Sequence, residues 1–175
     1  LVSTLPFPQL LDICKLVYPD DVFSCNKVLV FNLGFDSKGN DKLNSWVYVP
    51  EKEFIFYRIG YYDNIMNTDR MSLYVEIGFS QKQEMLKEGL YLDRILSDLR
   101  KMGIITTQKL VDYEAVLMNP AYVHINKKSV ETVEEYKEIL EKNDIYSIGR
   151  YGSWTYCSIE DNILEARELA EKLNK

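Results

Sequence analysis

The stretch "SWVYVPEKEFIFYRIGYY", residues 45–62, predicts two extended strands joined by a turn. Aromatic and β-branched residues, which favour strands, dominate both halves, and residues 50–52 between them favour a turn. In the second half, the two-residue period of a strand places Arg58 on the same face as Phe54 and Phe56. Two strands so closely linked indicate an antiparallel sheet.

The remaining segments predict helices interspersed among further strands. Strands are expected at residues 1–4, 26–36, 71–79, 108–125 with a break at Asn119–Pro120, and 144–149, and helices at residues 5–17, 83–103, 129–143 and 159–173. Because the strands cluster in the first half and the helices do not alternate strictly with them, the sequence predicts an α+β fold. Its sheet is expected to be mixed but mainly antiparallel, with flanking helices.

The ends and faces of these helices are also predictable. Gly103 is expected to end the helix at 83–103, and Ser129 is the expected N-cap of the helix that follows. The last helix is expected to turn inward an apolar face formed by Ile163, Ala166, Ala170 and Leu173.

Composition and charge narrow the class of protein. The chain has 175 residues, a net charge of −6 and no basic stripe, which argues against nucleic acid or a membrane surface as a partner. It has no apolar run of about 20 residues and no signal-peptide pattern, so a soluble, cytoplasmic protein without a membrane span is expected. The first residue is Leu rather than Met, which suggests a piece of a longer protein. Aromatic residues make up 13% of the chain, a share that favours strands and surfaces for flat or sugar-like ligands.

The usual catalytic residue sets are missing from the sequence. His124 is the only histidine and lies in a strand-like context, so neither a Ser-His-Asp triad nor a histidine metal site is expected. Cys14, Cys25 and Cys157 form no C-x-x-C pair, which predicts reduced thiols and no metal. No two glycines form G-x-G, so a dinucleotide-binding loop is also missing from this chain. Catalytic residues therefore stay unassigned.

The segment "GRYGSWTYCSIEDNILEA", residues 149–166, predicts a turn between a strand and a helix. Gly149 and Gly152 flank Arg150 and let the backbone take a positive φ or approach a ligand closely. Ser158 and Asp161 match a capping box, in which each side chain bonds to the other residue's backbone amide. Glu160 and Asp161 add negative charge at the helix start, so a ring carbonyl suits the remaining amides better than a phosphate does.

Three segments together resemble one family. "IGRYGSWTYCSIEDNILEA" is similar to the C-terminal flavin-binding segment of the FAD-dependent amine oxidase superfamily, and most closely to UDP-galactopyranose mutase-like flavoproteins. "SWVYVPEKEFIFYRI" resembles the W-x-Y-x-P-E…F-Y-R strand pair of that branch, and "VSTLPFPQLL" resembles its S-T-[LI]-P strand. The departure is at "CSIEDNI", where the eukaryotic mutases carry a longer insertion, and this puts the identity of the substrate in doubt.

The resemblance implies a division of the chain and a set of site residues. Residues 1–148 would form the substrate-binding domain, and 149–175 the flavin-contacting turn and helix of a dinucleotide-binding domain that this chain does not contain. FAD would bind the full-length parent and be absent from the fragment. The implied substrate-binding residues are Arg58 and Arg150, which would clamp a diphosphate, with Tyr156 and Tyr122. The implied cofactor-binding residues are Gly149, Arg150, Ser158, Ile159, Glu160 and Asp161.

The function implied by the resemblance is action on a nucleotide sugar or a surface-polysaccharide precursor, with an isolated fragment that is itself inactive. One alternative is a flavin-dependent amine oxidase, a protoporphyrinogen oxidase-like enzyme or a desaturase-type oxidoreductase. The other is a non-catalytic binding module, which leaves open whether the chain is an enzyme. Residues alone favour a structural role for Arg58, paired with Glu76 at the sheet edge. A domain interface left exposed in the fragment could also drive homo-oligomer formation.

Overall fold

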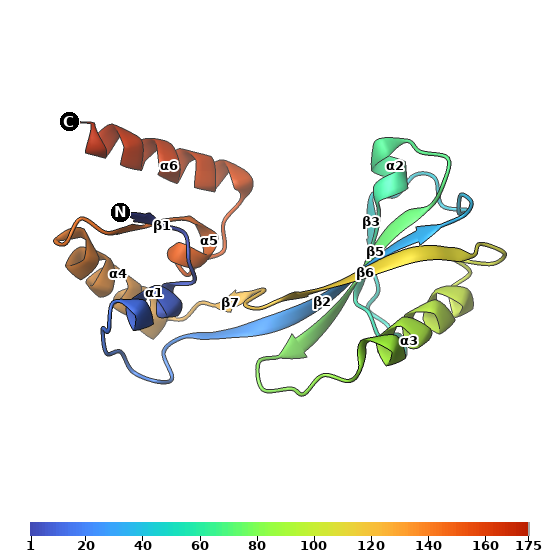
Figure 1. The fold of residues 1–175 in the computed structure, drawn as a ribbon, viewed down its shortest axis with the longest axis horizontal. Coiled ribbons are helices and arrows are strands. Elements are labelled where there is room, and N and C mark those ends of the chain that lie inside the picture. The colour runs from blue at the N-terminus through green and yellow to red at the C-terminus, as the bar shows by residue number, and fades with distance from the viewer. Residues whose placement is uncertain (175) are drawn as a thin grey trace. The chain divides into compact units, whose positions relative to one another are not determined.

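A computed structural model describes residues 1–174, which divide into two compact units (Figure 1). The first unit comprises residues 1–26 and 120–174, and the second comprises residues 27–119. The predicted α+β class with a mainly antiparallel sheet is confirmed. The helices found in residues 1–174 are all too short or too polar to cross a membrane.

The second unit is built on a sheet with strand order β3-β4-β5-β2-β6. Its elements are β2 (Ser24–Phe35), β3 (Trp46–Tyr48), β4 (Arg58–Tyr61), α2 (Tyr62–Met66), β5 (Ser72–Ser80), α3 (Glu88–Lys101) and β6 (Leu110–Met118). β4 pairs antiparallel with both β3 and β5, and β2 pairs antiparallel with β6. This pairing aligns Tyr48, Arg58 and Glu76 in one row across three strands.

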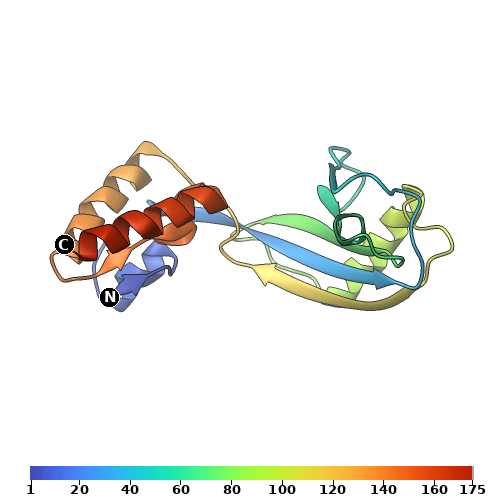
Figure 2. The ribbon, with the colours of Figure 1, turned by 90° about the horizontal axis from the view of Figure 1, so that it is seen from above.

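The two faces of this sheet differ because alternate side chains of each strand point to opposite sides. One face is apolar and packs against Tyr91, Ile95 and Leu99 of α3, which runs along the sheet (Figure 2). The strand predicted at residues 71–79 is confirmed as β5, with Leu73, Val75, Ile77 and Phe79 buried in the core. The opposite face carries the row that contains Arg58.

The first unit packs short strands against helices. Its elements are β1 (Val2–Ser3), α1 (Phe7–Ile13), β7 (Val123–His124), α4 (Lys127–Glu141), β8 (Tyr146–Ser147), α5 (Gly149–Gly152) and α6 (Ile159–Leu173). β1 and β8 pair in parallel, and β7 pairs with the first residues of β2. A separate core forms around Phe7, Leu10, Leu11, Leu140 and Trp154.

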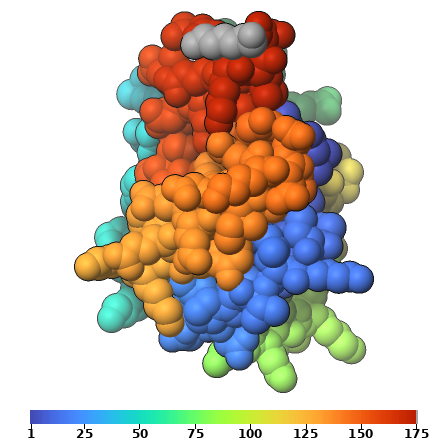
Figure 3. Space-filling view, turned by 90° about the vertical axis from the view of Figure 1, so that its left-hand side faces the viewer, coloured from blue at the N-terminus to red at the C-terminus, as the bar shows by residue number. Residues whose placement is uncertain are grey.

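The first unit therefore joins two segments that are far apart in the sequence. Figure 3 shows them on one face, with the blue N-terminal residues directly against the orange residues of the C-terminal segment and α6 in red beyond them. The parallel pairing of Val2 with Tyr146 connects the same two segments through the backbone. Both segments are thus needed to complete the core around Phe7.

The prediction for residues 54–57 was wrong. β4 begins only at Arg58, and Phe56 and Ile59 are both buried although the predicted alternation put them on opposite faces. The cause is a long-range contact, since the buried carboxylate of Asp98 in α3 accepts a hydrogen bond from the Ile55 amide at 3.0 Å. That contact holds the segment in a turn.

Two predictions about helix starts were also wrong. α3 begins at Glu88 rather than near residue 83, and Leu86 and Leu90 are exposed. Asn126, not Ser129, is the N-cap of α4, and Ser129 takes the third helical position of a capping box with Asn126. An asparagine is as good an N-cap as a serine, so the helix gains three residues at its start.

The predicted inner face of α6 was wrong as well. Ile163, Ala166, Ala170 and Leu173 are exposed, while Asn162, Glu165 and Leu169 lie against the rest of the first unit. Polar contacts determine which face of α6 packs against the unit, because Asn162 and Glu165 accept hydrogen bonds from the turn that precedes α6.

Candidate functional site

The turn between β8 and α6 is fixed by glycine geometry and by hydrogen bonds to α6. Gly149 has a φ of +84°, a conformation that side chains rarely adopt. Its amide donates to Glu165 Oε2 at 2.7 Å, and the Arg150 amide donates to Asn162 Oδ1 at 3.0 Å. Gly152 is closely packed, because an added Cβ would lie 3.1 Å from Ser147 Oγ.

This turn places Arg150 against two tyrosine rings. The guanidinium carbon lies 4.6 Å from the centre of the Tyr156 ring and 5.3 Å from that of Tyr122, and the two rings stack at 6.5 Å. Cation–π contact of this kind orients the guanidinium without neutralising it. Within residues 1–174 the side chain has no carboxylate partner, so its positive charge is available to an anion.

The start of α6 carries the predicted capping box. Ser158 Oγ accepts from the Asp161 amide at 3.1 Å, and the Asp161 carboxylate accepts from the Ser158 amide at 2.7 Å. These hydrogen bonds lower the pKa of Asp161 below its ordinary range, the bond from the Ser158 amide contributing most. The amides of Ile159 and Glu160 have no partner among the described residues and remain open to an acceptor.

Arg58 lies in the second unit in a different environment. Its Nη2 donates to Glu76 Oε1, and its guanidinium carbon lies 5.9 Å from the ring centres of both Tyr48 and Tyr74. Burial disfavours the charged form of the guanidinium and so lowers the pKa of Arg58. The hydrogen bonds to Glu76 and Tyr48 outweigh this effect and raise the pKa above its usual value. Its Nε–H is buried without an acceptor in the part of the chain that the structure describes. One donor of a paired guanidinium is therefore still unsatisfied.

The structure thus brings together three of the four predicted substrate-binding residues, Arg150, Tyr122 and Tyr156. Arg58 is held separately by Glu76, the partner expected from the residues alone. Sequence reasoning missed Tyr48 and Tyr74 beside Arg58, because only the strand register aligns them. It also missed Asn162 and Glu165, which hold the turn and which helical spacing from Ser158 could have indicated.

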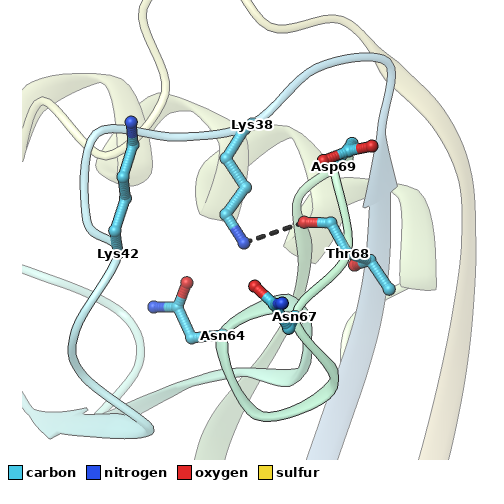
Figure 4. A pocket seen from close by; sticks show the side chains of 6 residues that line it. All are labelled: Lys38, Lys42, Asn64, Asn67, Thr68 and Asp69. Atoms are coloured by element: carbon cyan, nitrogen blue, oxygen red, sulfur yellow. Dashed lines mark hydrogen bonds between the residues drawn. The ribbon is translucent and has the colours of Figure 1, made fainter.

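A further polar pocket of about 320 Å³ lies in the second unit, at the end of α2 (Figure 4). Lys38 extends into it, and its ammonium donates to the Thr68 carbonyl at 3.0 Å and pairs with the buried Asp63 at 2.8 Å. None of the predicted site residues lines this pocket. Because the Lys38 ammonium is already bonded to the Thr68 carbonyl and to Asp63, we assign the pocket no role in the candidate site.

Other kinds of site find little support in the described residues. Across residues 1–174, no group of three or more histidine, cysteine, aspartate or glutamate side chains is placed to bind a metal ion. The three cysteines are free. His124 lies in β7, and its Nδ1 is 2.9 Å from Ser24 Oγ on the paired strand, which is a structural role.

Comparison with known proteins identifies the fold. No family model and no curated protein sequence matches the chain. Among solved structures, a reduced UDP-galactopyranose mutase matches 89% of this chain and 36% of its own, with a TM-score of 0.71 and 22% identity. A protein from Exiguobacterium sp. 255-15 assigned as a protoporphyrinogen oxidase matches 98% of this chain and 40% of its own, with a TM-score of 0.76 and 13% identity.

The chain thus spans about two fifths of the length of these two structures. UDP-galactopyranose mutase is the protein type that the three sequence segments most resemble, and a protoporphyrinogen oxidase is among the alternatives implied by that resemblance. The chain therefore shares the fold of the matching part of these two structures.

Proposed function

We propose that this chain is the substrate-binding and C-terminal part of an FAD-dependent enzyme that acts on a nucleotide sugar. The observation that carries the proposal is Arg150, whose guanidinium contacts the rings of Tyr122 and Tyr156 and has no carboxylate partner within residues 1–174. A guanidinium offers a fixed fork of donors that suits a diphosphate, and the hydroxyl groups of the two tyrosines can donate to the same group.

Tyr156 also makes this cluster accessible, because the residue is 70% exposed. A ligand can therefore approach the guanidinium without any change in the buried core. Net charge supports the same assignment, since a chain with a net charge of −6 needs placed arginines to attract an anion. The two flanking rings leave the guanidinium charged and oriented at low entropic cost.

The residues at the start of α6 fit a flavin ring. The open amides of Ile159 and Glu160 can donate to a neutral ring carbonyl, whereas the carboxylates of Glu160 and Asp161 would repel a phosphate. Bound FAD would supply the covalent or redox chemistry of the reaction. The described residues orient the substrate and the ring edge. We place the FAD-binding loop outside this chain, and the fragment by itself is proposed to be inactive.

We further propose a cytoplasmic location and a boundary at residue 148 between two functional parts of the chain. The three free cysteines fit a reducing compartment. Residues 1–148 would bind the substrate, and residues 149–175 would contact the flavin. The exposed apolar side chains of α6, led by Ile159 and Ile163, fit the surface that would meet the flavin domain.

A second candidate is a flavin-dependent oxidase or desaturase. The ion pair of Arg58 with Glu76 favours it, because a guanidinium already matched by a carboxylate is a poorer anion clamp. The fold shared with the Exiguobacterium protein is compatible with this alternative. In that case Arg58 stabilises the sheet, and Arg150 would bind a carboxylate substrate.

Calorimetric titration of the chain with UDP and UDP-galactose tests the proposal. We expect Arg150→Ala to weaken binding by about tenfold to a hundredfold, the usual worth of a charged hydrogen-bonding group. Arg150→Lys should recover only part of this loss because lysine lacks the fork of donors. Arg167→Ala is the matched control, since Arg167 is an exposed arginine of α6 paired with Glu171.

The same titrations separate the two candidates. Arg58→Ala should also weaken UDP binding if Arg58 completes the clamp, and should leave it unchanged in an oxidase. Equal affinity of the original chain and Arg150→Ala for UDP would rule out the diphosphate site. An FAD titration of the full-length protein, followed by flavin fluorescence, tests the cofactor contact separately, with Ser158→Ala as the variant.

A further inference from the structure

The outer strand of the sheet in the second unit has an uncovered edge. Among residues 1–174, β6 ends the strand order and pairs on one side only, with β2. Its apolar side chains are accessible to solvent rather than covered, with exposed fractions of 65% for Val111, 38% for Tyr113, 40% for Val116, 46% for Leu117 and 42% for Met118. Each β-strand edge also presents backbone amides and carbonyls that need partners.

Two of the features that normally protect such an edge are missing from β6. Its sequence, "LVDYEAVLM", holds no proline and no lysine, and its charges are Asp112 and Glu114. The pairing with β2 is regular from Asp112 to Met118, and the one irregularity lies opposite Gly34 and Phe35 at the strand's start. Exposed, regular and apolar edges of this kind pair with another strand.

The backbone indicates which residues face the open edge. The Tyr113 amide donates to the carboxylate of Asp112, its neighbour in sequence, at 2.9 Å. A strand presents the amides of alternate residues to the same side, so the amides of Ala115 and Leu117 face the edge together with that of Tyr113. A new strand would meet the amides of Ala115 and Leu117 directly, and its carbonyl would replace the Asp112 carboxylate as the acceptor for the Tyr113 amide.

We propose that β6 is a dimerisation edge, on which the β6 strand of a second copy pairs antiparallel about a two-fold axis at Ala115. In this register Tyr113 lies opposite Leu117 of the other copy, and Glu114 lies opposite Val116. Tyr113 and Leu117 share the face of the sheet that carries the core, because they pair with Leu33 and Leu29 of β2. The two sheets become one continuous sheet, which closes both open edges at once.

Repulsion between carboxylates disfavours the other registers in which two β6 strands could pair. A two-fold axis at Glu114 would place that carboxylate opposite itself, and an axis at Tyr113 would place Asp112 opposite Glu114. Like charges directly opposite each other destabilise a strand pair. A two-fold axis at Val116 avoids opposed carboxylates, but only residues 114–118 of each β6 strand then pair with the other copy. The axis at Ala115 pairs residues 112–118 and places every carboxylate opposite an apolar side chain.

The proposal does not depend on the proposed function, and paired variants at Val116 test it. Val116→Glu adds a carboxylate opposite Glu114 of the other copy, twice per dimer by symmetry. Val116→Lys places an ammonium there instead. We expect sedimentation velocity to show a concentration-dependent dimer of the original chain, a dissociation constant raised on the order of tenfold by Val116→Glu, and one unchanged or lowered by Val116→Lys.

Two further variants test whether the added charge acts through the paired edge. Adding Glu114→Lys to Val116→Glu should restore the dimer, because the opposite charges then face each other. Ile163→Glu adds the same charge to the exposed apolar side of α6 and should leave the dimer intact. Circular dichroism checks that each variant is folded. A chain that is monomeric at all concentrations, equal weakening by both Val116 variants, or dissociation by Ile163→Glu would each overturn the proposal.

Discussion

Arg58 and Arg150 show at the scale of single residues how neighbours decide what one side chain can do. Both guanidiniums lie near two tyrosine rings, but only Arg58 has a carboxylate beside it, supplied by Glu76 across the β4–β5 pair. That pair neutralises most of its charge locally. Arg150 lacks such a partner among residues 1–174 and keeps its charge, so it is the stronger candidate for contact with an anionic ligand.

Gly152 gives a prediction at this scale. An added Cβ would lie 3.1 Å from Ser147 Oγ and 3.3 Å from the Ser3 carbonyl, and the latter is backbone that cannot easily move. We expect Gly152→Ala to lower the free energy of unfolding by about 1–3 kcal/mol through overpacking. Gly89→Ala is the control, because no atom lies within 4 Å of its added Cβ and α3 should gain stability. Urea denaturation of both variants compares them directly.

If Gly152→Ala proved as stable as the original chain, the close contact of α5 with β1 and β8 would not be the reason for glycine at this position. Chemical shifts of Arg150 and Tyr156 would then show whether the turn tolerates the change.

At the scale of elements, the capping box of α6 makes the helix start sensitive to pH. Its hydrogen bonds lower the pKa of Asp161 in the folded chain. A carboxyl group whose pKa is lowered by folding stabilises the fold above its unfolded pKa, and that contribution is lost as the pH falls through the folded value. We expect the first turn of α6 to fray as the pH drops below about 4.

Carboxyl chemical shifts of Asp161, measured by NMR across this pH range, check the prediction. Ser158→Ala should raise the pKa of Asp161 only part of the way to its ordinary value, because the larger contribution comes from the Ser158 amide, which stays. Asp36 in the second unit, whose pKa is lowered by the hydrogen bond from the Lys109 amide, is the control and should titrate alike in both proteins. A full return of the Asp161 pKa to the ordinary range in Ser158→Ala would show that the side chain alone holds the carboxylate.

At the scale of the whole molecule, two separate cores predict two regions of stability. Phe31 is fully buried in the core of the second unit, and Phe7 is fully buried in that of the first. Replacing a buried phenylalanine by alanine costs about 3–5 kcal/mol. We expect Phe31→Ala to speed amide hydrogen exchange in β4 and β5 while leaving α4 protected, and Phe7→Ala to do the reverse.

Native-state hydrogen exchange followed by mass spectrometry resolves these regions. The original chain under the same conditions gives the reference rates for β5 and α4. Equal loss of protection in both units from either substitution would show that the chain unfolds as one cooperative body despite its two cores.

The sequence by itself determined what neighbours along the chain control. The bounds of α6 and its capping box depend on residues three or four apart, and the alternation of β5 depends on residues two apart, so both were predictable. The α+β class followed from the sum of such local patterns. The three family-like segments indicated the fold that the solved structures then matched.

Tertiary structure alone decided which partners these elements meet. The buried carboxylate of Asp98 delays the start of β4, and Asn162 with Glu165, rather than the apolar residues, selects the packed face of α6. The two units and the open edge of β6 also arise only once distant strands have paired. The physical reason is that these features depend on contacts between residues far apart in the chain, which local propensity and periodicity do not specify.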